Sequence, residues 1–119
     1  MIALSISGIA FAAFAFSSVA AYAPFDRIVR RLHDTARDTW FRIGAPYGFF
    51  WWPRDGSWAY GLTEKWRVFL DLQGEAPDWI SDDAELLKTH RTFFILTRAM
   101  WVSLLCAMAS AIIAALLLT

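Results

Sequence analysis

The chain has 119 residues, with eleven Lys and Arg residues and eleven Asp and Glu residues, so its formal net charge at pH 7 is zero. This balance argues against a nucleic-acid partner, because phosphate binding needs an excess of basic side chains. Hydrophobic residues make up 58% of the chain, and every charged residue lies within 26–98. That stretch is close to the lower size limit for a self-sufficient core, so an independent catalytic domain is not expected.

Two uncharged apolar stretches, 2–23 and 100–118, flank the charged region. Each has close to the roughly 20 apolar residues that cross about 30 Å of hydrocarbon. The first ends in Ala21-Tyr22-Ala23, which is similar to a signal-peptide cleavage site, but no basic residue precedes it and Pro24 would follow the cut. We therefore expect an all-α membrane protein: two transmembrane helices joined by an amphipathic, tryptophan-rich cytoplasmic segment.

Basic residues predict the orientation of these spans. They crowd the exit of the first span and the entrance of the second, and such residues favour the cytoplasmic side; they are Arg27, Arg30, Arg31, Arg37, Lys88, Arg91 and Arg98. Arg98 is expected at the membrane boundary, where its long stem can reach the headgroups. In a bacterium this predicts an inner-membrane protein with a cytoplasmic connection and both termini in the periplasm.

Residues 24–43 predict a second, amphipathic helix that leaves the membrane. Pro24 suits its first turn and Gly44-Ala45-Pro46 its end. Its apolar positions recur at helical spacing; they are Phe25, Ile28, Val29, Leu32, Ala36, Trp40 and Ile43. Two interpretations stay open: an interfacial or partner-docking helix, or a continuation that packs on the other helix.

Residues 44–62 predict an irregular interfacial loop with the densest aromatic cluster of the chain. It carries Phe49, Phe50, Trp51 and Trp52, followed by a turn at Arg54-Asp55-Gly56. Trp and Tyr favour the headgroup level because their rings are apolar and their N–H or O–H groups are polar. The alternative is that these rings contact a pigment, a quinone or a neighbouring subunit.

The second half of the connection predicts a short helix over 63–74, with Trp66, Phe69 and Leu70 as its apolar face. A linker over 75–81 follows. Ser81 or Asp82 is then expected to cap one long helix, with Asp82 and Glu85 at capping-box spacing. Its part over 82–99 would lie in the cytoplasm and its part over 100–118 in the membrane.

Small residues predict where helices pack in the membrane. Ser103, Ala107, Ala111 and Ala115 repeat every four residues, and Gly8 with Ala12 forms a shorter version in the first span. Such stripes let helix backbones approach closely in lipid. The two spans would pack on each other, or else the stripes would serve self-association or docking onto other membrane protein subunits.

Residues with catalytic or ligand chemistry are few. His33 and His90 have no ligand-type spacing and are expected to be solvent-exposed, and Cys106 is a single cysteine inside the second span. Asp34 and Asp38 lie among arginines on one helix face and predict a solvated charge network. We expect no enzymatic activity, no cofactor and no metal.

Several short motifs follow the first span in a recognisable order. They are Arg30-Arg31-Leu32, Gly48-Phe49-Phe50, Asp82-Asp83, Phe94-Ile95-Leu96-Thr97 and Ala99-Met100. This order resembles the universal stress protein B family of small bacterial inner-membrane proteins. The resemblance implies a stress-related, non-enzymatic membrane protein without a cofactor. The hypothesis from the sequence is a binding or scaffold protein in the lipid bilayer, and the alternative is an accessory subunit of a large respiratory or photosynthetic complex.

Overall fold

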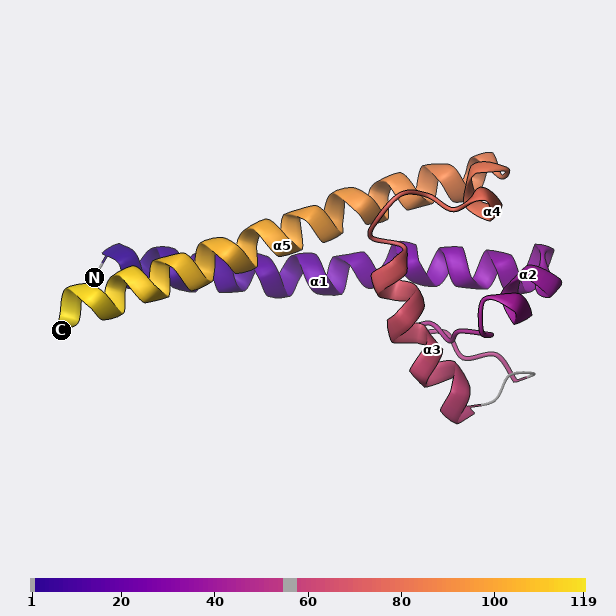
Figure 1. The fold of residues 1–119 in the computed structure, drawn as a ribbon, viewed down its shortest axis with the longest axis horizontal. Coiled ribbons are helices and arrows are strands. Elements are labelled where there is room, and N and C mark those ends of the chain that lie inside the picture. Colours follow the sequence, from indigo (N-terminus) through magenta and orange to yellow (C-terminus); the bar gives the residue numbers. More distant parts are fainter. Residues whose placement is uncertain (1, 55–57) are drawn as a thin grey trace. The chain divides into compact units, whose positions relative to one another are not determined.

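A computed structural model describes residues 2–54 and 58–119 of the chain. The regular elements within these residues are all α-helices: α1 at Ile2–Thr35, α2 at Arg37–Arg42, α3 at Trp58–Asp71, α4 at Asp78–Ser81 and α5 at Ala84–Leu118 (Figure 1). The turn expected at 54–56 lies mostly outside the described residues. The chain divides into two compact units, which we call the helix-pair unit (residues up to Ala20, with Ile95–Thr119) and the aromatic unit (Ala21–Phe94).

The helix-pair unit contains the outer parts of α1 and α5, the two helices long and apolar enough to cross a membrane. Their most apolar 18-residue windows have mean hydropathies of 2.0 and 2.4, and only 11% of each window is buried. A core helix of a soluble protein would be mostly buried, whereas these outward apolar faces are typical of helices that could span a membrane. Both chain ends lie at one end of this pair, where Ile2 and Leu118 line the same shallow hollow (Figure 1).

Buried positions of the helix-pair unit alternate in steps of three and four along each helix. They are Ser7, Ala10 and Ser17 in α1 and Thr97, Met100, Ala107 and Ala114 in α5, with half-buried Phe14, Leu104 and Ala111 completing the pattern. This spacing is typical of helices that pack side by side along a seam. The Ser7 hydroxyl also donates a hydrogen bond to the Ala107 carbonyl oxygen, at 3.2 Å.

The expected break at Pro24 is wrong, because α1 continues through this residue to Thr35. Proline removes one backbone donor and costs roughly 3 kcal/mol inside a helix. Here Phe25, Ile28 and Leu32 follow it and are at most 1% exposed. Burying three such side chains offsets that cost, at about 1.5 to 3 kcal/mol each.

The helix expected to run to Ile43 instead breaks at Ala36, where φ is −142°, and resumes as the six-residue α2. No Gly or Pro stands at this position. The break accompanies the burial of Trp40, whose indole Nε1 donates a 3.0 Å hydrogen bond to the Pro46 carbonyl oxygen. The predicted apolar face is nevertheless confirmed for Phe25, Ile28, Val29, Leu32 and Trp40, all of which are buried.

The remaining helices also differ from their expected limits. The helix expected at 63–74 is α3, which covers Trp58–Asp71 and is followed by a turn, and the expected linker contains the short helix α4. Phe69 is buried, but Trp66 and Leu70 are more than half exposed, so the predicted apolar face is only partly right. The face that packs inward consists of Gly61, Lys65, Val68 and Phe69.

Candidate interaction site

Aromatic rings form the centre of the aromatic unit, and they come from four parts of the chain. Phe25 and Phe69 lie 5.4 Å apart between ring centroids, and Phe93 lies within 6.1 Å of both. Phe49 stacks on Tyr22 at 3.8 Å and meets Phe69 edge-on at 5.4 Å. Offset-stacked and edge-on ring pairs contribute beyond the area they bury, so this cluster fixes the aromatic loop against α1, α3 and α5.

Asp26 holds the start of the loop through its backbone. Its two carboxylate oxygens accept hydrogen bonds from the Phe49 and Phe50 amides, both at 2.7 Å. A Cβ atom added to Gly48 would lie 2.7 Å from the Asp26 carboxylate, so a side chain there would displace it. Hydrogen bonds to a charged acceptor are about twice as strong as neutral ones, and two of them make the loop a fixed element.

Tyr47 continues this attachment toward α3. Its amide donates to the Gly61 carbonyl oxygen at 3.2 Å, and its ring lies against Gly61 so closely that an added Cβ would come within 2.4 Å. Lys65, one turn further along α3, places its ammonium 4.7 Å from the centre of the Phe49 ring and 5.3 Å from that of Trp66. A largely buried lysine is thereby stabilised by two aromatic faces.

The four aromatic residues predicted as a contact site divide into an inward and an outward pair. Phe49 is half-buried in the cluster, and half-buried Trp51 meets the His33 ring edge-on at 5.0 Å. Phe50 is 70% exposed and Trp52 is 67% exposed. Residues 44–54 are irregular, as expected, whereas 58–62 of the predicted loop belong to α3. The loop presents two large apolar side chains outward on a backbone that is held in place.

Both histidines are placed differently from the expectation of solvent-exposed residues. His90 is buried, and its Nε2 lies 2.8 Å from the Leu72 carbonyl oxygen, a contact in which Nε2 must carry the proton. His33 lies between Trp40 and Trp51, with Nδ1 3.2 Å from an Asp34 carboxylate oxygen. Among the described residues, no three His, Cys, Asp or Glu side chains come together in a way that could hold a metal ion.

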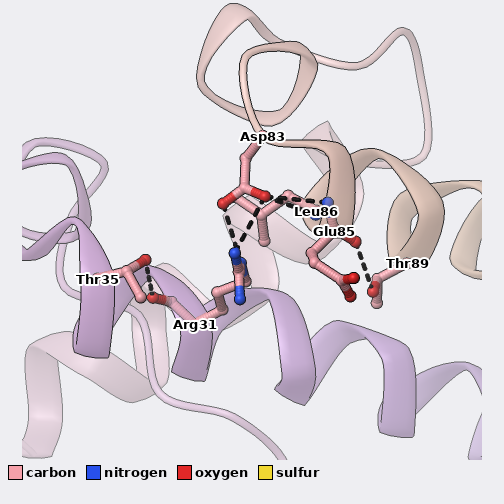
Figure 2. A network of polar contacts seen from close by, with 6 residues as sticks. All are labelled: Arg31, Thr35, Asp83, Glu85, Leu86 and Thr89. Carbon is pink, nitrogen blue, oxygen red and sulfur yellow. Dashed lines mark hydrogen bonds and ion pairs between the residues drawn. The ribbon is translucent and has the colours of Figure 1, made fainter.

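The start of α5 is joined to α1 by an ion pair that the sequence analysis missed. Arg31 donates from Nε and a terminal nitrogen to the two Asp83 carboxylate oxygens, at 2.9 and 3.2 Å (Figure 2). One of these oxygens also accepts hydrogen bonds from the Glu85 and Leu86 amides. Asp83, rather than Ser81 or Asp82, is thus the cap of α5, and the Arg31 guanidinium lowers the pKa of its carboxyl group below the usual range.

The small residues predicted for helix packing divide into buried and exposed ones. Ala107 is fully buried, and Ser103 and Ala111 are half-buried, whereas Gly8, Ala12 and Ala115 are exposed and lie outside the contact between α1 and α5. No heavy atom lies within 4 Å of a Cβ built on Gly8. Arg98 and Cys106 are exposed on α5.

Two open cavities in the aromatic unit share Arg42 and Trp79. One of about 330 Å³ is also lined by Arg67 and Asp71, and one of about 570 Å³ by Thr39 and Asp82, among others. Their linings mix both charge signs with apolar groups and do not define one ligand. Comparisons of the chain with protein-family models, curated proteins and solved structures found no match.

Proposed function

We propose that this chain is a non-enzymatic, two-span membrane scaffold that binds another membrane protein through Phe50 and Trp52. The observation that carries the proposal is the outward placement of these two rings on a loop whose backbone is clamped by Asp26. Binding energy at interfaces is concentrated in large side chains, among which Trp is enriched. Holding them in place beforehand reduces the ordering cost of association.

Copurification in mild detergent tests this proposal. The double variant Phe50→Ser, Trp52→Ser should lose a stoichiometric partner while retaining its helical content by circular dichroism. Phe41→Ser is the matched control, because Phe41 is an exposed aromatic residue on α2 at 52% exposure, and it should keep the partner. Retention of the partner by the double variant at the parental ratio would remove the aromatic loop from the proposal.

A second candidate, an accessory subunit of a larger membrane complex, is favoured by the exposed small residues of α1. Gly8 and Ala12 lie outside the seam with α5, and the space around Gly8 is open. Another helix could approach closely there. Gly8→Leu should then remove a larger copurifying chain without affecting the spans, whereas Ile9→Leu, on an exposed neighbour, should leave it bound.

The proposed location is the inner membrane of a bacterium, with 26–98 cytoplasmic and both termini periplasmic, and the proposed context is the stress-related one of the universal stress protein B family. The basic residues around the span ends support this orientation. In a Cys106→Ala background, an impermeant thiol reagent applied to intact cells should label a cysteine at Thr119 and not one at exposed Glu75. The reverse labelling pattern would contradict the orientation.

A further inference from the structure

The exposed apolar residues of α3 lie on one sector of the helix, which adjoins the sector that packs inward. The Trp66 ring, at the border, meets the Phe49 ring at 5.2 Å between centroids. Trp58, Leu62, Trp66 and Leu70 follow one another at intervals of four residues. Trp58, Trp66 and Leu70 are 70%, 51% and 58% exposed, and Leu62 is half-buried. We call these four residues the α3 stripe. A stripe of two indoles and two leucines on a folded surface requires an apolar covering.

The polar residues of α3 occupy the remaining sector. Arg67 forms ion pairs with Glu64 and with Asp71, the latter at 3.1 Å. Lys65 is the other charged residue of the helix and lies on the inward face against Phe49. The helix therefore carries two acidic and two basic residues and has no net charge, which leaves apolar burial as the source of any affinity of the α3 stripe.

Ring contacts fix the level of α3 relative to the end of the first apolar stretch. Phe69 lies 6.0 Å from Tyr22 and 5.4 Å from Phe25, measured between ring centroids. Tyr22 is the penultimate residue of the uncharged stretch 2–23, and Asp26 is the first charged residue after it. A helix rises 1.5 Å per residue, so these contacts hold the Phe69 end of α3 within about one turn of the level at which the chain leaves an apolar environment.

The direction of α3 relative to the adjoining part of α1 is the next observation. Within the aromatic unit, α3 runs across the direction of α1 rather than along it (Figure 1). Trp residues and an amphipathic helix without a long apolar run are typical of the lipid headgroup layer.

From these observations we infer that α3 is an interfacial helix whose stripe of Trp58, Leu62, Trp66 and Leu70 is seated in the lipid headgroup layer. The occupant of this surface is the bilayer into which the protein's own spans insert. Because the helix carries no net charge, the seating depends little on anionic lipid. The inference rests on the membrane location of the proposed scaffold and adds a second, partner-independent contact to it.

Spin labels on the purified full chain in phosphatidylcholine vesicles test the seating. In the Cys106→Ala background, single cysteines replace Leu62 or Leu70 in the α3 stripe and, as matched controls, Tyr60 or Asp71, which are exposed on the opposite side of the helix. The stripe labels should collide with oxygen and be shielded from a water-soluble nickel complex, and the control labels should show the opposite. Adding anionic lipid to 30% of the vesicle should leave the ratio of the two collision rates unchanged within twofold.

Hydroxyl-radical footprinting of the unmodified chain provides a second measurement that needs no substitution. Tyr60 is 56% exposed and serves as the internal control beside Trp58 and Trp66. In vesicles of the full chain the two tryptophans should be oxidised at least threefold more slowly than Tyr60, after correction for the intrinsic reactivity of the two residue types. The inference would be overturned if the stripe labels were accessible to nickel or shielded from both reagents. Full oxidation of both tryptophans would overturn it as well. None of these results depends on the partner, so the scaffold proposal is tested separately.

Discussion

The helix-pair unit and the aromatic unit are both rich in apolar residues, but different interactions hold them together. In the helix-pair unit the buried positions are mostly small, and the Ser7 hydroxyl donates a hydrogen bond to the Ala107 carbonyl oxygen on the other helix. The aromatic unit buries large rings and secures its loop and helix ends with Asp26 and with the Arg31–Asp83 pair. In lipid, burying an apolar side chain between helices gives little free energy, because the lipid is apolar as well. Close packing of the helix backbones then stabilises the helix pair. In water, burial of large rings is the main source of stability.

The largest expected effect comes from removing the same ring type in each unit. Phe25→Ala should destabilise the aromatic unit by about 3 to 5 kcal/mol, because Phe25 is fully buried among Phe49, Phe69 and Phe93. Phe16→Ala, at a residue that is 75% exposed on α1, should change little. Denaturant unfolding in detergent measures both. Equal losses would show that exposure in the structure does not separate the two environments.

Asp26→Asn should release the aromatic loop while leaving the ring cluster in place. Hydrogen bonds to a charged group contribute about 1.5 to 3 kcal/mol, and the amide of Asn can accept only through its single oxygen. Hydrogen exchange at the Phe49 and Phe50 amides should accelerate by at least tenfold. Asp38→Asn, on the exposed side of α2, is the control, and its exchange at these two amides should match that of the parent.

Ala107→Leu should weaken the seam of the helix-pair unit by about 1 to 3 kcal/mol, because a larger side chain forces the backbones apart at a fully buried position. Ala115→Leu is the same change at an exposed position of the same helix. It should be nearly neutral. Energy transfer between dyes on the two spans, followed through a denaturing-detergent titration, compares the variants, and a loss confined to Ala115→Leu would mean that another face carries the contact.

The smallest effect concerns the pH dependence of the Arg31–Asp83 pair. The pKa of Asp83 is lowered in the folded state by the Arg31 hydrogen bond, so the pair stabilises the fold above the unfolded pKa, near 3.9. That contribution disappears as pH falls through the lower folded pKa. Asp83→Asn keeps a capping side chain, so its stability should fall below the parent at pH 7 and approach it below pH 3. Arg31→Gln should show the same convergence, and a constant gap across this range would exclude the ion pair as its source.

Much of the helical layout followed from the sequence because it depends on local or solvent-related signals. The confinement of charge to 26–98 predicted two apolar helices at the ends, and helical spacing predicted the buried face from Phe25 to Trp40. These signals need no knowledge of neighbours, since a long uncharged run and a 3.6-residue period have few other structural outcomes. The aromatic loop was predictable from a local signal too, because its residues show neither a helical nor a strand period.

Tertiary contacts decided the remaining features. Pro24 stays inside α1 because buried residues after it offset its cost, and α1 ends at Thr35 without any breaking residue. Sequence spacing assigned the cap to Ser81 or Asp82, whereas Asp83 both caps α5 and pairs with Arg31, 52 positions earlier.

Tertiary contacts also decided which aromatic and small residues face inward and which face outward. Phe49 turns inward and Phe50 outward on a backbone whose two amides Asp26 binds, and Ala107 rather than Gly8 enters the seam because of the register between two helices. Pairings between residues far apart in the chain leave no periodic signal. The sequence by itself therefore determined where the long apolar helices and the periodic buried face over 25–40 lie, and only the tertiary structure decided where the helices break and which side chains of the loop and of the small-residue stripes are buried.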